Sequence, residues 1–209
     1  MDIVCLLFNG ITALDIVGPY EVLQRLPDAN VEFVAHEKGT VRTDNGSLAL
    51  VADHALDEVT RADVLVVPGG FATRRLEDDA ALLDWIRTID ATTTWTTSVC
   101  TGSVLLAAAG LLEGKEATTH WASMERLAIY GAIPTGRRVV EQGKIITAAG
   151  VSSGIDMGLT LVARIAGDEY AQGVQLGIEY DPQPPFDAGA PEKAPEIAAL
   201  LRARSRFTS

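Results

Sequence analysis

The sequence has few cysteines and few histidines. Its 209 residues include two cysteines, Cys5 and Cys100, and three histidines, His36, His54 and His120. Two distant cysteines provide no disulfide framework, and such a chain is expected to work in the reducing cytoplasm. The histidines are scattered, so neither they nor the cysteines show the spacing of a metal site. We therefore expect no bound metal ion.

Long hydrophobic runs and positive charge are also scarce. No run approaches eighteen apolar residues, and the apolar stretch 3–8 lacks the preceding basic residues of a signal peptide. Lys and Arg number 17 against 28 Asp and Glu, a net charge of −11. Such a surface repels phosphate backbones and anionic membranes, so neither nucleic acid nor membrane is an expected partner. The absence of a G-x-G-x-x-G or Walker sequence leaves nucleotide binding without a motif.

What is present is the composition of one globular domain over residues 1–209, with 47% hydrophobic and 22% charged residues. Short apolar runs and helix-like periodicity alternate along the chain. The expected strands are 3–8, 31–35, 64–67, 93–99 and 117–121, with hairpins over 41–51 and 138–148. The expected helices are 79–89, 104–109, 123–130, 152–166, 168–178 and 195–206. This order predicts an α/β sandwich around a mostly parallel central sheet.

The segment from Leu14 to Leu26 has apolar residues at helical spacing, interrupted by Gly18-Pro19. We predict that a turn containing Asp15 precedes the helix proper, since proline is disfavoured inside a helix. Asp15 has apolar neighbours on both sides. A carboxylate in this context is expected to be buried, with either a functional or a capping role.

The chain is organised around a strand, a cysteine and a helix. Residues 93–99 are rich in Thr, Trp and Val, residues 104–109 in Ala and Leu, and Cys100 lies at the bend between them. A sharp strand-to-helix turn resembles a nucleophile elbow, and the helix N-terminus is expected to help the thiol ionise. A buried structural cysteine is the alternative interpretation.

Two further candidates accompany Cys100. Gly69-Gly70 follows the strand 64–67, and ligands bind beyond the carboxyl ends of parallel strands. The amides at Gly70 and Thr101 are therefore candidates for an oxyanion-hole-like cradle. His120 is a candidate for a Cys–His pair, and the alternative is a hydrogen-bonded histidine that helps to hold the fold.

Several motifs together are similar to the ThiJ/PfpI superfamily. They are Pro68-Gly69-Gly70, Ser98-Val99-Cys100-Thr101-Gly102-Ser103, Ala109-Gly110-Leu111-Leu112 and Ala117-Thr118-Thr119-His120-Trp121. Three more stretches resemble, within that superfamily, the isocyanide hydratases. These are Leu14-Asp15-Ile16-Val17-Gly18-Pro19, Gly154-Ile155-Asp156, and Glu179-Tyr180 with Pro184-Pro185-Phe186-Asp187-Ala188-Gly189. The resemblance extends from residue 1 to about residue 195 of the printed sequence.

The resemblance implies a flavodoxin-like three-layer sandwich that forms homodimers and carries a nucleophile-elbow cysteine. It also implies hydration of an organic isocyanide to an N-substituted formamide, without a cofactor. Carried onto this chain, Cys100 is the nucleophile and Asp15 the acid–base partner. Amides near Gly70 and Thr101 line the anion site, and His120 is a possible supporting residue.

The chemistry of the two side chains agrees with this assignment. A Cys100 thiolate would attack the terminal carbon of the isocyanide to give a thioimidate, and a protonated Asp15 would supply the proton that this carbon needs. An ionised Asp15 beside a thiolate would raise the pKa of the thiol. We therefore expect the two groups to share one proton. Ala148-Ala149 stands where the family is Gly-rich, which bears on the mobility of the site.

Two other functions remain open at this level. A ligand-sensing regulator domain would need a DNA-binding helix pair, whereas the sequence predicts a single helix after the Pro-rich arm, and the net charge opposes DNA binding. A glyoxalase-like or redox-responsive protein could use the same cysteine on carbonyl or peroxide chemistry. An amidotransferase is disfavoured because Ala122, two residues after His120, is not acidic.

Overall fold

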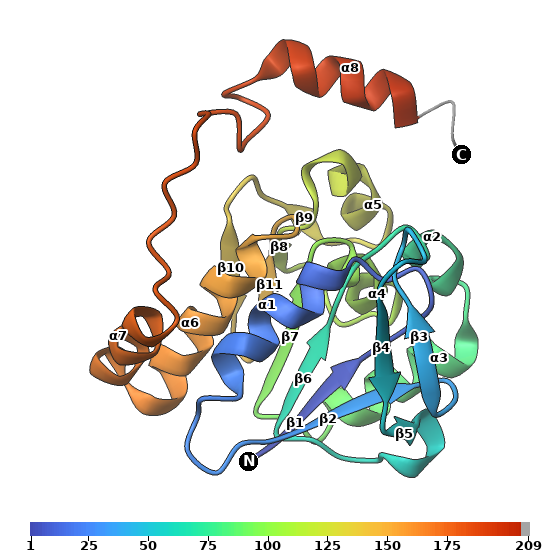
Figure 1. The fold of residues 1–209 in the computed structure, drawn as a ribbon. Coiled ribbons are helices and arrows are strands. Elements are labelled where there is room, and N and C mark those ends of the chain that lie inside the picture. Colours follow the sequence, from blue (N-terminus) through green and yellow to red (C-terminus); the bar gives the residue numbers. More distant parts are fainter. Residues whose placement is uncertain (206–209) are drawn as a thin grey trace. The chain divides into compact units, whose positions relative to one another are not determined.

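The computed structural model describes residues 1–205 of the chain. It divides into two units, Met1–Ile178 and the residues from Glu179 onward. The first unit holds the sheet and helices α1 to α7, and the second contains an extended arm and helix α8, Pro195–Ser205 (Figure 1). No helix in the range 1–205 is long and apolar enough to cross a membrane.

The first unit is built on a seven-stranded sheet in the order β10-β11-β7-β6-β1-β2-β5. The strands are β1 Asp2–Leu6, β2 Asn30–Ala35, β5 His54–Ala55, β6 Val64–Val67, β7 Trp95–Val99, β10 Val139–Gln142 and β11 Ile145–Ala148. Every neighbouring pair is parallel except β10 and β11. The three central strands β6, β1 and β7 consist largely of buried residues, because helices cover both faces of a parallel sheet.

The helices of the first unit lie in two layers around the sheet (Figure 1). They are α1 Ala13–Leu23, α2 Thr73–Leu76, α3 Ala80–Asp90, α4 Gly102–Ala108, α5 Met124–Ile129, α6 Ser153–Ala166 and α7 Asp168–Gly177. Helix α6 contacts α1, α7 and β11, whereas α4 contacts α3, β6 and β7. The predicted α/β sandwich with a mostly parallel central sheet is thus confirmed.

Two small sheets complete this unit. The hairpin predicted over 41–51 is present as β3, Gly39–Arg42, and β4, Ala49–Ala52, paired antiparallel. The hairpin predicted over 138–148 is formed by β10 and β11 and contributes to the main sheet. The strand predicted over 117–121 is present only at its first residue, in the short strand β8, Glu116–Ala117, which pairs with the unpredicted β9, Ile133–Pro134. Beyond Ala117 the prediction is wrong: the amide of Thr118 donates to the hydroxyl of Thr147, and a 3-10 helix begins at Trp121. Arg206, the predicted last residue of the C-terminal helix, lies outside the described residues.

The first helix corrects one prediction. The turn that was expected to contain Asp15 and to precede the helix is absent, since α1 runs unbroken from Ala13 with Asp15 in its first turn and Pro19 inside it. A proline in a helix interior costs about 3 kcal/mol or more, so packing must compensate for it. The Cδ of Pro19 lies 3.0 Å from where a Cβ of Gly154 would be, so α6 packs directly against the proline ring.

Glycines set the distance between α1 and α6. A Cβ atom at Gly158 would lie 3.0 Å from the Cβ of Val22, and one at Gly18 would lie 3.2 Å from the Cγ1 of Ile155. These helix faces therefore approach more closely than larger residues allow. Because α1 carries Asp15 and α6 follows β11, this contact positions one side of the candidate site.

We predict that Gly158→Leu lowers the free energy of unfolding by about 1–3 kcal/mol, because the added side chain must push α6 away from Val22. The matched control is Gly173→Leu in α7, where no atom lies within 4 Å of an added Cβ. Removing that exposed helical glycine should raise stability by about 0.5 kcal/mol. Urea unfolding of both variants checks the pair, and equal effects would contradict the close helix contact.

Candidate active site

Cys100 lies at the bend between β7 and α4, as predicted. Its φ angle is +56°, in the left-handed region that costs a non-glycine residue about 1–3 kcal/mol. Gly102 permits the bend, because a Cβ atom there would lie 2.1 Å from the carbonyl oxygen of Val67. The cysteine is only 5% exposed. The elbow geometry and the burial of the thiol are thus both present.

Hydrogen bonds hold the backbone of Cys100 in this strained conformation. Its N–H donates to the carbonyl oxygens of Ala148 and Ala149, at 3.1 and 3.0 Å. Its carbonyl oxygen accepts from the hydroxyls of Thr119 and Ser103, at 2.9 and 3.1 Å. The hydroxyl of Thr119 gives the Thr-Thr-His-Trp motif a structural role at the site that the sequence did not reveal.

The side chain of Asp15 extends from the first turn of α1 toward the bend at Cys100. Its side chain is fully buried, and its Oδ2 accepts a hydrogen bond of 3.0 Å from the amide of Gly69. A Cβ at Gly69 would lie 2.9 Å from that oxygen and 2.5 Å from the nitrogen of Thr101, so only glycine fits. In the described part of the chain, Oδ1 has no conventional hydrogen-bond partner. The expected burial of Asp15 is confirmed.

Burial dominates the electrostatics of Asp15. Desolvation raises the pKa of this carboxyl to about 7, although hydrogen bonds with Cys100 and with the Gly69 amide act to lower it. The negative charge of Asp44 raises the same pKa further. A carboxyl with this pKa can hold or release a proton near neutrality, as acid–base catalysis requires.

The prediction that the Cys100 thiol ionises easily is wrong. Burial, followed by the charge of Asp15, raises the pKa of Cys100 to about 12, outweighing the amides of Thr101 and Val151 that act to lower it. Helix α4 has only seven residues, and its N-terminus does not overcome the desolvation. Since the two groups interact, their protons are released by the pair rather than by each residue independently.

Two amides stabilise negative charge on the sulfur, those of Thr101 and Val151. The Thr101 amide was predicted for a different role, in an oxyanion-hole-like cradle, and that role stays a prediction; Val151 was not predicted. Val151 has a φ of +40°, which a β-branched residue rarely adopts, so no sequence pattern would have indicated it. The amide of Gly70 donates to the Thr101 Oγ1 at 3.0 Å and is therefore engaged within the protein. Its role at an anion site stays a prediction.

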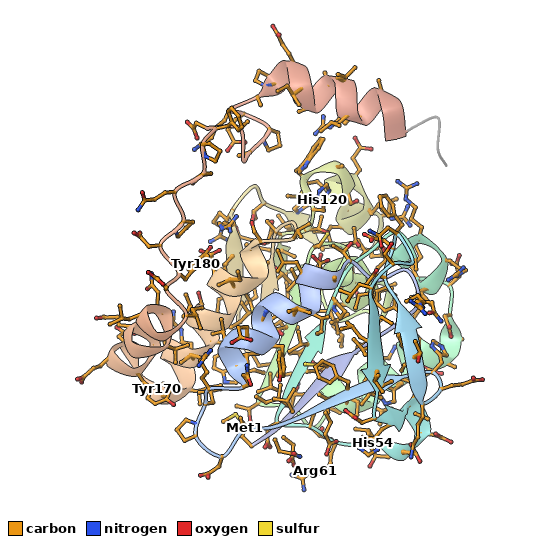
Figure 2. The ribbon with its side chains drawn as sticks, viewed as in Figure 1. Met1, His54, Arg61, His120, Tyr170 and Tyr180 are labelled. Atoms are coloured by element: carbon orange, nitrogen blue, oxygen red, sulfur yellow. The ribbon has the colours of Figure 1, made fainter. Side chains whose placement is uncertain are left out.

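His120 lies beside the site without an interaction to Cys100 in the described structure. A Cβ at Gly150 would lie 2.5 Å from its Cδ2, so the ring packs over that glycine (Figure 2 labels its position). Its Nδ1 accepts from the amide of Ala122 at 3.3 Å, and burial lowers its pKa. These contacts suit a neutral histidine that shapes the site more than the base of a Cys–His pair.

The second cysteine, Cys5, lies outside the site. It is fully buried in β1, and burial raises its pKa to about 12, as suits a core residue. Among residues 1–205 there is no cluster of three metal-ligating side chains.

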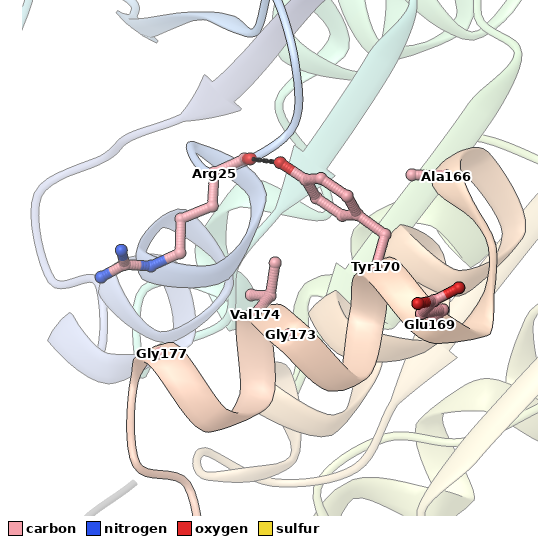
Figure 3. Close-up of a pocket in the computed structure, with 7 residues that line it drawn as sticks. All are labelled: Arg25, Ala166, Glu169, Tyr170, Gly173, Val174 and Gly177. Atoms are coloured by element: carbon pink, nitrogen blue, oxygen red, sulfur yellow. Dashed lines mark hydrogen bonds between the residues drawn. The ribbon is translucent and has the colours of Figure 1, made fainter.

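The cavity in Figure 3 has a volume of about 590 Å³, and the hydroxyl of Tyr170 donates to the Arg25 carbonyl there. Neither Cys100 nor Asp15 lines it.

Comparisons with known proteins agree on one family. The model of the DJ-1/PfpI family matches residues 1–164. An isonitrile hydratase of Pseudomonas putida is 45% identical over 201 residues, covering 96% of this chain and 87% of the relative. An HTH-type transcriptional regulator of Pseudomonas aeruginosa is 30% identical over 85% of this chain but only 53% of the regulator.

The solved structures show the same fold. A ThiJ/PfpI family protein from Pseudomonas syringae superposes with a TM-score of 0.93 at 40% identity, covering 99% of this chain and 87% of that one. Oxidized DJ-1 of Toxoplasma gondii superposes with a TM-score of 0.75 at 24% identity, which bears on the fold alone. The predicted flavodoxin-like architecture is thereby confirmed.

The buried carboxyl generates a prediction about stability. Because the pKa of Asp15 is about 7 in the folded chain and 3.8 ordinarily, folding favours its protonated form. This contribution is complete in acid and is lost as pH rises through 7. Between about pH 5 and about pH 8, wild type should lose about 3 kcal/mol of unfolding free energy relative to Asp15→Asn. Urea unfolding at both pH values measures this.

The matched control for that experiment is Asp57→Asn, which removes one carboxylate from an exposed position. Its stability should follow that of wild type across the same pH range. Parallel stability curves for wild type and Asp15→Asn would contradict the raised pKa of the buried Asp15 carboxyl.

Proposed function

The chain belongs to the DJ-1/PfpI family, and we propose that it hydrates organic isocyanides, also called isonitriles, to N-substituted formamides. The observation that carries this proposal is the Asp15–Cys100 pair, a buried acid–base group beside a buried thiol. Identity of 45% to an isonitrile hydratase over nearly the whole chain supports the same reaction. The chain is thus proposed to be an enzyme of the carbon–nitrogen lyase or hydro-lyase type.

In the first proposed step, the sulfur of Cys100 attacks the terminal carbon of the isocyanide. Asp15 takes the thiol proton as the sulfur–carbon bond forms and passes it to that carbon, giving a thioimidate. The pKa of Asp15 near 7 suits both halves of this transfer, whereas a thiol with a pKa of about 12 needs such a base. The pair therefore works with one shared proton.

In the second proposed step, water replaces the sulfur. Asp15 accepts one proton from the water as its oxygen adds to the thioimidate carbon, and passes that proton to the nitrogen. The adduct then collapses to the formamide: its hydroxyl proton returns to the Asp15–Cys100 pair as the sulfur of Cys100 leaves. Isocyanide plus water thus accounts for every atom, and the pair regains its one proton. No electrons are gained or lost overall, so the proposed reaction needs no redox cofactor.

The surrounding residues have proposed supporting roles. The amides of Thr101 and Val151 stabilise charge on the sulfur as it attacks and leaves. Gly70 helps to orient Thr101 through the hydrogen bond to its hydroxyl. His120 packs over Gly150, next to Val151, and so supports the loop that carries the Val151 amide.

There are two alternative functions. The regulator relative is covered by this chain over about half of its length, so its similarity bears on that part alone. A glyoxalase-like or redox role would use the same cysteine, so the geometry does not distinguish it from hydration. Substrate tests decide between those two.

We predict that the purified protein converts a simple aryl isocyanide to its formamide, measured by chromatography of the product. Cys100→Ala should show no turnover, because it lacks the attacking sulfur. Asp15→Asn should lose activity by about 100-fold or more, since it cannot carry the proton. Circular dichroism should show that both variants keep the fold.

Two outcomes would overturn this assignment. Wild type that turns over methylglyoxal and not the isocyanide would favour the glyoxalase-like alternative. Full activity in Asp15→Asn would remove the proposed role of the carboxyl.

We also propose that the protein is a cytoplasmic homodimer. Support comes from α1, where Leu14 and Val17 expose 40% and 37% of their surface in the single chain. Apolar side chains on one helix are candidates for contact with a second copy. The cytoplasm would keep the Cys100 thiol reduced.

Sedimentation at micromolar protein should give a species of twice the 22.2 kDa of one chain. Replacing Leu14 and Val17 together with serine should shift it toward one chain. A 22 kDa species for the unmutated protein would reject the dimer.

A further inference from the structure

We propose that Asp44, in the turn of the β3–β4 hairpin, is a positioning residue whose negative charge helps to hold a proton on the Asp15–Cys100 pair. The inference rests on the proposed function for its catalytic meaning. Its geometry is independent of that function, because the hairpin turn is attached directly to the start of α1.

Hydrogen bonds fix Asp44 at this place. Its backbone N–H donates to the carbonyl oxygen of Ile11 at 2.9 Å, and its Oδ2 accepts from the hydroxyl of Thr12 at 3.2 Å. A parallel bridge between Ile11 and Thr43 joins the same two segments. The carboxylate is therefore held beside the residue that precedes α1, and Asp15 is in the first turn of that helix.

Backbone hydrogen bonds connect Thr12, the residue that holds the Asp44 carboxylate, to the Asp15–Cys100 pair. The amide of Thr12 donates to the carbonyl oxygen of Gly69 at 3.0 Å, and the amide of Gly69 donates to Oδ2 of Asp15 at 3.0 Å. Three segments that are distant in the sequence thus meet here: the hairpin turn, the start of α1 and the end of β6. Asp44 is the charged side chain that the turn contributes.

The charges around the pair are few. Within the described residues, the groups that influence the Asp15 carboxyl are Cys100, the Gly69 amide and Asp44. Asp44 has no ion pair among those residues, and its Oδ1 accepts from the amide of Asn45 at 2.8 Å. The guanidinium of Arg42, the cation of the same hairpin, donates instead to the carbonyl oxygen of Gly46. The charge of Asp44 is therefore not cancelled by a partner.

This charge affects the pH range in which the enzyme is active. Fully protonated, the pair has no nucleophile, and after both protons are lost it has no acid. The state with one proton forms when the pair loses its first proton. A nearby negative charge opposes that loss, so it moves the transition to higher pH. Removing the charge should move the transition to lower pH.

The test measures the reactivity of Cys100 rather than isocyanide turnover. Wild type, Asp44→Asn and the matched control Asp57→Asn are alkylated with iodoacetamide between about pH 5 and about pH 9, and the rate at Cys100 is followed by mass spectrometry. Asparagine keeps a polar oxygen and an amide for Thr12 and Asn45 but carries no charge. The midpoint for Asp44→Asn should move down by about 0.3 pH unit, the size of a solvent-screened interaction between carboxylates.

Two further measurements separate charge from shape. Asp44→Glu retains the charge and should restore the midpoint of wild type. In about 1 M NaCl, the difference between wild type and Asp44→Asn should shrink to less than half, because salt screens exposed charges.

Three results would overturn the inference. These are an unshifted midpoint in Asp44→Asn, an equal shift in Asp57→Asn, and a shift that salt leaves unchanged. Failure of the proposed function would look different. In that case the alkylation midpoints would behave as described, while no variant, including wild type, converted an isocyanide.

Discussion

The burial of the Asp15 carboxyl beside the Cys100 thiol, with no cation from residues 1–205 to neutralise it, is the constraint on which the site depends. Burying an ionised group is costly, so the folded chain favours the protonated carboxyl, and this preference places its pKa near 7. The same burial makes the thiol a poor nucleophile by itself. The two groups therefore work together, because the carboxylate of Asp15 can act as the base that removes the proton from the Cys100 thiol.

Holding two such groups together requires close backbone approaches at several points. Gly69 and Gly102 lack a Cβ and so allow the end of β6 and the loop after it to lie against the bend at Cys100. Gly158 allows α6 to pack closely against α1 in the same way. Hydroxyls rather than charges then complete the polar contacts, as the Thr119 and Ser103 bonds to the Cys100 carbonyl illustrate. In a site assembled from amides and hydroxyls, burial sets the electrostatics of Asp15, and the exposed charge of Asp44 adds a smaller effect in the same direction.

Local patterns predicted the parts of this site that depend on strand and helix periodicity. Cys100 was found because a β-rich run changes to an Ala- and Leu-rich run around it, and Asp15 because its neighbours are apolar. Val151 and Thr119 were not found, because their roles arise from a strained φ angle and from a contact across nineteen residues. Pro19 was misinterpreted because the packing of α6 against its ring is a tertiary effect that overrides helix propensity.

The ends of the sheet bear on how the protein behaves at high concentration. On one side the sheet ends with β5, a strand of only two residues, and on the other with β10, which turns antiparallel to its neighbour. A two-residue edge presents few unpaired backbone groups to a passing chain. Growth by strand addition, the first step toward aggregation, therefore has little template at β5, although the sheet interior is rich in valine and isoleucine.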